Sequence, residues 1–97
     1  MSQNTSDSDR AQPPEVLFRG SGGRCLLFHF RNGEGLPPHT HAGQGVVVAA
    51  LAGRVRFEID GQSLELAAGE CRAVSGDTFS SQAQEDGTRL LVSLISE

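Results

Sequence analysis

The sequence predicts an all-β domain, either a sandwich or a barrel, on three observations. Short apolar stretches are divided by glycine-bearing turns along most of the chain. Within several stretches, apolar and polar side chains alternate with the two-residue period of a strand. None of the stretches has the period of a helix. About eight short strands at regular spacing are typical of a sandwich or a barrel.

The chain has 97 residues and a formal net charge of -4. This length suits a single domain, whose core is small. Mixed charges with a negative balance argue against nucleic acid and anionic membrane surfaces as partners, because both attract basic patches. Residues 1–15 are polar and end in Pro13-Pro14, so we expect a flexible tail there and one folded domain over residues 16–97.

The chain shows neither an apolar signal core nor an apolar run long enough to cross a bilayer. We therefore expect a cytoplasmic protein that does not associate with a membrane. Its two cysteines, Cys25 and Cys71, form no CxxC pair. Two reduced thiols packed in the core are the simplest interpretation for an intracellular protein.

Two apolar segments predict strands in the first half of the chain. "RCLLFHFR", residues 24–31, alternates between two faces, and a flexible turn over "GSGGR", residues 20–24, is expected before it. The alternation places Leu26, Phe28 and Phe30 on one face, and Cys25, Leu27 and His29 on the other. "VVVAAL", residues 46–51, is apolar throughout, which is typical of a strand covered on both sides.

A hairpin is the clearest local prediction. In "RVRFEIDGQSLELAAGE", residues 54–70, apolar and charged residues alternate on both sides of Asp60-Gly61. This dipeptide favours a two-residue turn, because both turn positions need a positive φ. A turn centred there pairs Ile59 with Gln62, Phe57 with Leu64, and Val55 with Leu66, so the apolar residues fall on one face.

Three further strands are predicted in the second half of the chain. "ECRAVSG", residues 70–76, and "TFSSQAQ", residues 78–84, flank a turn around Gly76-Asp77, in which Asp77 is expected to serve the turn. "TRLLVSLIS", residues 88–96, follows a turn at Asp86-Gly87 and closes the domain.

Two histidines, His39 and His41, stand one residue apart in "PPHTH", residues 37–41. In extended chain, residues i and i+2 point to the same side, so two imidazoles can converge on one ion. The alternative is a pair of polar residues after a Pro-Pro turn, hydrogen-bonded to each other or to water. No serine lies in a GxSxG-like turn, and no nucleophile stands beside a recognisable base.

Taken together, these motifs resemble the small single-domain cupins, whose fold is a double-stranded β-helix or jelly-roll barrel. Gly35, "PPHTH" and Gly53 match the first conserved stretch of the family. "FEIDGQSLELAAGE", residues 57–70, fits the hairpin that joins the two stretches, and Gly69-Glu70 and Gly76 match the second stretch. The resemblance covers the chain from about Val16 onward and implies a cupin barrel.

The resemblance also implies a metal site, and the sequence supplies only part of it. In metal-binding cupins, two histidines, a glutamate and a last histidine hold one metal, so His39 and His41 are the implied ligands here, for Zn, Ni, Mn or Fe. The glutamate position falls on Val46, or on Gly45 when it is counted from His41, and the last histidine falls on Phe79, or on Ser80 after a shift of one residue. Losing the carboxylate removes both a bond and the charge that offsets the cation.

We therefore expect a cupin barrel that binds a small molecule, with a divalent metal held by this incomplete pair of histidines. The pocket would be lined by His39, His41, Gln44, Phe79 and apolar strand residues. We also expect a homodimer, because dimerisation would cover edge strands and enlarge the core.

Two other classes remain open. A metal-dependent enzyme of the dioxygenase or isomerase type, as found in the wider family, would need a third ligand from His29, Gln44 or a cysteine. A regulatory or interaction module would have a filled barrel and an exposed apolar patch. A binding module would instead have an elongated apolar pocket with the histidines at one end.

Overall fold

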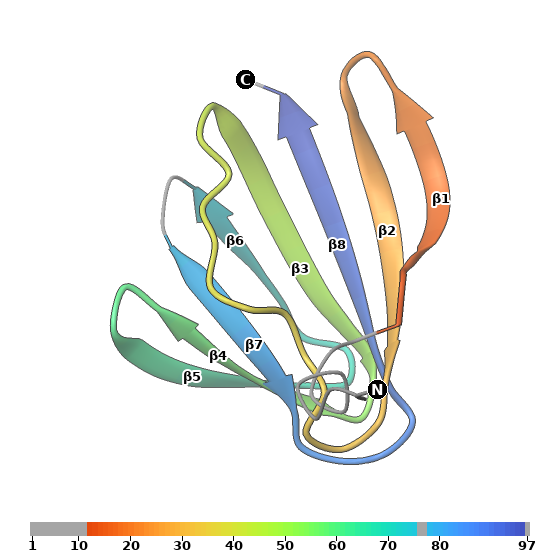
Figure 1. Ribbon diagram of the computed structural model, residues 1–97, viewed down its shortest axis with the longest axis vertical. Helices are drawn as coiled ribbons and strands as arrows, with labels where there is room; N and C mark the ends of the chain where they lie inside the picture. Colours follow the sequence, from red (N-terminus) through yellow and green to blue (C-terminus); the bar gives the residue numbers. More distant parts are fainter. Residues whose placement is uncertain (1–11, 76–77, 97) are drawn as a thin grey trace, which may run out of the picture.

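A computed structural model describes residues 12–75 and 78–96, which form two antiparallel β-sheets (Figure 1). The strands are β1 (Glu15–Gly20), β2 (Gly23–Phe30), β3 (Gln44–Ala52), β4 (Arg54–Ile59), β5 (Gln62–Ala67), β6 (Cys71–Ser75), β7 (Phe79–Ala83) and β8 (Thr88–Ser96). In these residues, no helix is long and apolar enough to cross a membrane. Most of the expected tail, and the expected turn at Gly76-Asp77, lie outside the described residues.

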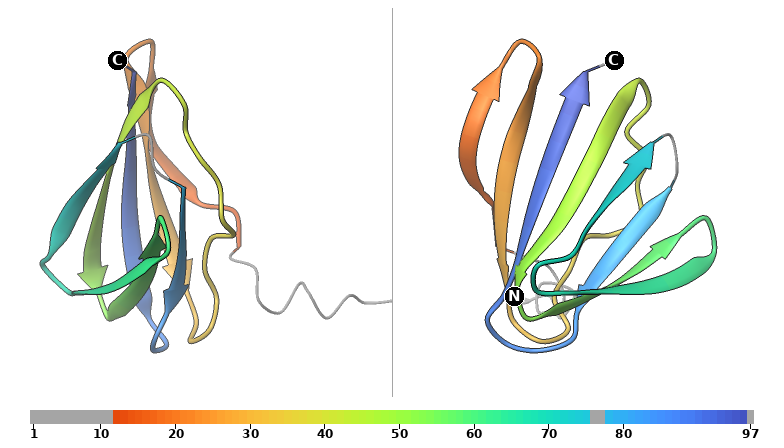
Figure 2. Two further views of the ribbon diagram at one scale, coloured as in Figure 1. Left: turned by 90° about the vertical axis from the view of Figure 1, so that its left-hand side faces the viewer. Right: turned by 180° about the vertical axis from the view of Figure 1, so that it is seen from behind.

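The larger sheet has the strand order β1-β2-β8-β3-β6, and the smaller sheet has the order β5-β4-β7. β8 lies at the centre of the larger sheet, between two strands that come much earlier in the chain. The side view in Figure 2 shows the smaller sheet standing in front of the larger one. The two sheets enclose the interior between them, and the prediction of an all-β domain is confirmed.

The chain over residues 33–39, here called the edge segment, extends the smaller sheet beyond β7. Leu36 and Ser81 exchange two backbone hydrogen bonds of 3.1 Å, and the amide of Ala83 donates to the carbonyl of Glu34 (2.8 Å). Further along, His39 forms an isolated antiparallel bridge with Phe79. The edge segment therefore fixes the histidine-bearing loop to β7.

Apolar side chains from both sheets fill the interior. Its centre contains Phe57 and Phe79, which are fully buried and whose ring centroids lie 6.4 Å apart. The remaining buried members of the core are Phe28, Phe30, Val46, Val48, Ala50, Val55, Leu66, Val74, Ala83, Leu90, Val92 and Leu94. The space between the sheets is thus a packed core, and a site at the rim of the barrel would have this core as its floor.

The predicted hairpin is confirmed in its register. β4 pairs with β5 so that Ile59 lies opposite Gln62 and Phe57 opposite Leu64. The turn residues Asp60 and Gly61 have φ angles of 49° and 83°, which is the conformation that a two-residue turn requires. The alternation predicted for β2 is also confirmed, since its core-facing residues are those that the pattern placed on one face.

The first strand was missed. The turn expected to precede the first strand instead joins β1 to β2, and "EVLFRG" pairs along the edge of β2. All six residues of β1 are exposed. A strand that buries no face has no periodic pattern of burial, so the alternation on which the prediction relied could not reveal it.

Two expectations about burial were wrong. Within one chain β3 is not covered on both sides, because Val47 and Leu51 on it are 36% and 49% exposed. The thiols are not both in the core either: Cys71 is exposed and Cys25 is half-buried, and both are free. The common reason is that the outer side of the larger sheet stays uncovered in a single chain, so apolar residues that face outward remain accessible.

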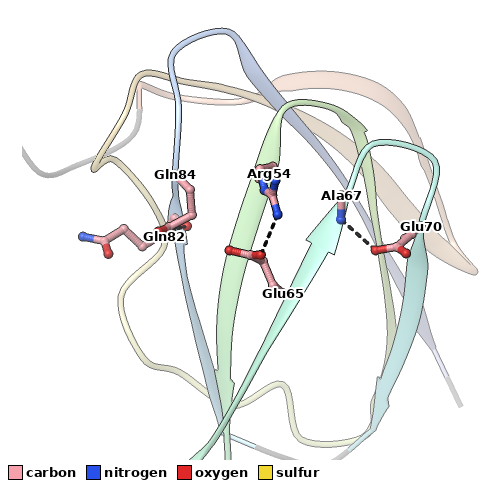
Figure 3. A network of polar contacts seen from close by, with 6 residues as sticks. All are labelled: Arg54, Glu65, Ala67, Glu70, Gln82 and Gln84. Atoms are coloured by element: carbon pink, nitrogen blue, oxygen red, sulfur yellow. Dashed lines mark hydrogen bonds and ion pairs between the residues drawn. The ribbon is translucent and has the colours of Figure 1, made fainter.

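The outer side of the smaller sheet is polar, in contrast (Figure 3). Arg54 on β4 and Glu65 on β5 form an ion pair of 3.1 Å across the strands. At the end of β5, the amide of Ala67 donates a hydrogen bond of 2.8 Å to the carboxylate of Glu70, which closes the turn into β6. Exposed pairs of this kind contribute little to stability, but they make this side compatible with water.

Gly35 allows the edge segment to approach β7. A Cβ atom at this position would collide with the carbonyl oxygen of Ser81 and lie 2.8 Å from the Cα of Gln82. Both atoms belong to the backbone of β7, so they cannot move aside without breaking the pairing.

We expect Gly35→Ala to lower the free energy of unfolding by about 3 kcal/mol, because the added methyl group overpacks a backbone contact. Gly22→Ala is the matched control, since a Cβ there meets nothing within 4 Å. Its effect should stay within about 0.5 kcal/mol. Urea unfolding of the two variants measures both effects, and equal stabilities would show that the edge segment does not need a glycine.

Candidate functional site

The two histidines lie at the rim of the interior, above an aromatic floor. His39 and Phe79 exchange two backbone hydrogen bonds of 3.1 Å, and residues opposite each other in an antiparallel pair point to the same side. The centroids of their rings are 5.2 Å apart. Thr40, between the histidines, shares a hydrogen bond of 2.6 Å with the hydroxyl of Thr78. Pairing with β7 therefore places His39 over the core.

The HxH spacing brings the imidazoles together, as the sequence predicts. The ring centroids of His39 and His41 are 4.6 Å apart, in an edge-to-face arrangement of 81°. Nδ1 of His39 donates a hydrogen bond of 2.8 Å to the carbonyl of Pro37. This bond fixes the tautomer, so that Nε2 of His39 carries the free lone pair when the ring is neutral.

Two further polar side chains lie near the histidine pair. The backbone amide of Gln44 donates to the carbonyl of His41 (3.3 Å), and its side chain lies close enough to His41 to raise the pKa of that imidazole through hydrogen bonding. Arg24, on β2, lies opposite the buried Leu94 and is close enough for its charge to act on His41. We call His39, His41, Gln44 and Arg24, with Phe79 as their floor, the barrel mouth.

The environment of the barrel mouth favours a neutral His41. Burial lowers the pKa of His41 below its usual value of 6.5. The neighbouring His39 and the positive charge of Arg24 lower this pKa further, and the hydrogen bond with Gln44 offsets part of the effect. Near neutral pH His41 is therefore an uncharged imidazole.

The positions that would complete a cupin metal shell belong to the core. Val46 and Phe79 are both buried among apolar side chains, where neither can bind a cation. Over residues 12–75 and 78–96, no three side chains of the His, Cys, Asp or Glu types gather into a group that could hold a metal. The role expected for Asp77 lies outside this part of the chain.

The proposed third ligands are mostly out of reach of the histidine pair. His29 lies on the outer side of β2, where its side chain is 58% exposed and 3.5 Å from the carboxylate of Glu15. Cys25 is on that same outer side and lies 3.4 Å from the hydroxyl of Ser93. Of the side chains considered, only Gln44 lies beside the pair.

This donor set does not fit a tightly held divalent metal. Two imidazoles and an amide provide no negative charge, and the nearby Arg24 repels a cation. The assignment of His39 and His41 as metal ligands therefore stays a prediction, and no chemical step is derived from a metal here.

A cleft of about 760 Å³ opens along the seam between β2 and the edge segment. Phe28, Leu36 and Ser81 line it together with residues of the segment before β1 and of β7. Neither histidine lines the cleft, but Pro37 does, and its carbonyl accepts the hydrogen bond from Nδ1 of His39. On β2, Arg24 precedes the cleft residue Phe28 by four residues, which in a strand span about 13 Å.

Sequence reasoning missed Arg24 and the cleft. The alternation in "RCLLFHFR" contained the signal for Arg24, since it has the same parity as Leu26 and Phe28 and therefore faces the same side. The cleft carried no such signal, because the edge segment that forms one of its walls has no alternation of its own.

Residues 26–78 match the family model described as the cupin domain. The chain belongs to the cupin domain family. No curated protein matches it. Solved structures confirm that the fold is the cupin β-barrel, which is the jelly-roll arrangement that the sequence predicts.

Three solved structures illustrate this likeness. An RmlC-like cupin protein from Desulfovibrio desulfuricans is 20% identical, with a TM-score of 0.80 over 98% of this chain and 96% of that chain. KdgF from Halomonas sp. is 14% identical, with a TM-score of 0.80 over 87% of this chain and 77% of that chain. A cupin protein from Bacteroides fragilis is 20% identical, with a TM-score of 0.73 over 99% of this chain and 81% of that chain. At such identities the likeness shows the fold alone.

The lowered pKa of His41 predicts how the stability of this cupin depends on pH. The unfolded chain takes up a proton on this side chain near pH 6.5, whereas the folded chain does so only at lower pH. Stability is therefore full above the unfolded pKa and falls as the pH drops below it. His41→Gln should lose less stability between pH 7.5 and pH 5.5 than the parent does. Urea unfolding of both proteins at both pH values tests this, and an equal loss of stability in the two would contradict it.

We expect the native, untagged cupin to contain far less than a stoichiometric amount of Zn, Ni, Mn or Fe, because its shell lacks a carboxylate. Elemental analysis of the parent and of the His39→Ala/His41→Ala double variant should find the same low metal content in both. A near-stoichiometric metal that the double variant loses would contradict this expectation and favour a metal-dependent enzyme.

Proposed function

We propose that this cupin domain binds a small organic acid, with the carboxylate at the barrel mouth and the apolar part along the seam. The observation that carries the proposal is the composition of the mouth. His39, His41 and Gln44 converge over an apolar floor, Arg24 adds a positive charge, and no described Asp, Glu or Cys joins the histidines as a third metal-ligating side chain.

The charge at the mouth favours an anion over a cation. Arginine provides several N–H donors for a carboxylate, and the glutamine amide provides two more. Since Nδ1 of His39 already donates to Pro37, its Nε2 can donate to a carboxylate only when the ring is protonated. A carboxylate at the mouth would favour the protonated form of His41, whose pKa is lowered by burial, so binding would be coupled to proton uptake and the affinity should rise as the pH falls.

The cleft supports the second half of the proposal. Its volume lies in the range of sites for small organic molecules, about 300–1,000 Å³. Phe28 and Leu36 offer apolar contacts there, and Ser81 offers a hydroxyl. The filled core restricts such a ligand to the rim and the seam, because the space beneath Phe79 is occupied. An acid with an apolar chain of medium length matches the distance from the mouth to the cleft.

The test is calorimetric titration with octanoate, with 1-octanol as the uncharged probe and acetate as the short one. We expect octanoate to bind more tightly than either probe, and more tightly at pH 6 than at pH 7.5. His39→Gln/His41→Gln should weaken octanoate binding about tenfold, as for the loss of a hydrogen bond to a charged group. His29→Gln, on the outer side of β2, should not change it.

Equal affinities for octanoate and 1-octanol would overturn the carboxylate assignment. Equal affinities for octanoate and acetate would overturn the role of the seam. No binding of octanoate at millimolar concentration would sink the proposal as a whole, and metal content would then decide the role of the histidine pair.

A further inference from the structure

Two arginines of the β1–β2 hairpin lie side by side next to the barrel mouth, and we propose that this pair selects an acid with two carboxylates at one end. Arg19 on β1 lies directly opposite Arg24 on β2. The assignment rests on the proposed function and makes its ligand more specific. The ligand is then a dicarboxylate with an apolar chain, and its second carboxylate contacts Arg19.

The pairing register places both arginines on the inner side of the larger sheet. Arg24 lies opposite Leu94 on β8, which is 2% exposed and belongs to the core. Residues directly opposite each other in an antiparallel sheet point to the same side, with Cβ atoms about 5 Å apart. The charge of Arg24 already acts on His41. Arg19 is therefore the next cation beyond the barrel mouth, on the same side of the sheet.

The two positive charges oppose each other without compensation. Like charges directly opposite each other destabilise an antiparallel pair. Over residues 12–75 and 78–96, none of the ion pairs includes Arg19 or Arg24. β1 buries none of its residues, so Arg19 does not serve the core either. An anion bound between the two guanidinium groups would remove their repulsion, which makes the pair a suitable site for a second negative charge.

An apolar track connects the arginine pair with the cleft. Val16 on β1 and Leu26 on β2 lie opposite each other in the next inward-facing row. Leu26 packs partly against the core, whereas Val16 is 47% exposed. One row further along β2, Phe28 lines the cleft. Figure 1 and the right-hand view of Figure 2 show β1 and β2 far from the strands of the smaller sheet, so this track stays open to a ligand chain.

Two carboxylates match the donors at this end of the barrel better than one. His39, Gln44 and Arg24 form one group at the barrel mouth, and Arg19 lies one strand further out, at a strand spacing of about 4.8 Å. A guanidinium group binds one carboxylate through two parallel N–H donors. A first carboxylate at Arg24 and the mouth thus leaves Arg19 for a second one on the neighbouring carbon of the ligand.

The experiment is calorimetric titration at pH 7.5 with heptylsuccinate, with its monoamides as matched probes that lack one charge, and with octanoate. We expect the parent to bind heptylsuccinate about tenfold more tightly than the monoamides, as for a hydrogen bond to a charged group. Arg19→Gln should abolish this difference, and Arg19→Lys should keep most of it because the charge remains. Arg56→Gln is the control, since it removes the same charge from an exposed position on β4 and should leave the difference unchanged.

The outcomes separate this assignment from the proposed function. Octanoate binding together with equal affinities for heptylsuccinate and its monoamides would overturn the dicarboxylate and leave the proposed function standing. A difference that Arg19→Gln retains in full, or that Arg56→Gln lowers equally, would overturn the role of Arg19. If none of the acids binds at millimolar concentration, both fail.

The stability of Arg19→Gln tests the uncompensated pair without any ligand. Because the substitution removes a repulsion, the variant should unfold at a urea concentration no lower than that of the parent. A clearly lower midpoint would show that Arg19 supports the fold, and would contradict its assignment to the ligand.

Discussion

The barrel mouth depends on one residue, Phe79, which belongs to the core and to the site at once. Its ring packs against Phe57 between the sheets, and its backbone holds His39 through two hydrogen bonds. The burial that fixes the ring therefore also fixes the direction of the imidazole above it. The apolar core of both sheets holds this floor in place. The polar groups at the rim therefore have a rigid support, although they lie on a loop and not on a regular strand.

Val46 and Phe79 stabilise the core, but as apolar residues they cannot bind a metal. A carboxylate or imidazole at these buried positions would need a metal or a partner to compensate for its desolvation. Each apolar side chain instead contributes about 1.5–3 kcal/mol of burial. In a barrel of this size, such contributions are a large share of the net stability. The barrel thus keeps the two histidines at the rim, where water reaches them, and closes the space below.

Much of this architecture could be predicted from the sequence, because the turn residues and the pattern of buried side chains indicate the same strands and the same register. The Asp60-Gly61 turn and the alternation of Phe57 with its neighbours set the same register, and the HxH spacing brought His39 and His41 together as expected. Prediction failed where burial depended on contacts between distant segments. Nothing in "EVLFRG" indicated a strand without a buried face, and nothing in the apolar run of β3 told whether its second side would be covered by this chain. Arg24 was missed, although the alternation places it on the same face of its strand as Leu26 and Phe28.

The central place of β8 has a consequence for how the chain folds. This strand is the last of the eight, yet it lies between β2 and β3, and His29 on β2 pairs with Arg89 on β8 across most of the sequence. Such non-local pairing makes folding slow, because long loops must close, at a cost in conformational entropy, before the contacts between the strands can offset that cost. During synthesis β2 and β3 have no neighbour between them until β8 emerges. Their apolar residues then stay open to other chains, so a delay at this stage favours aggregation over the barrel.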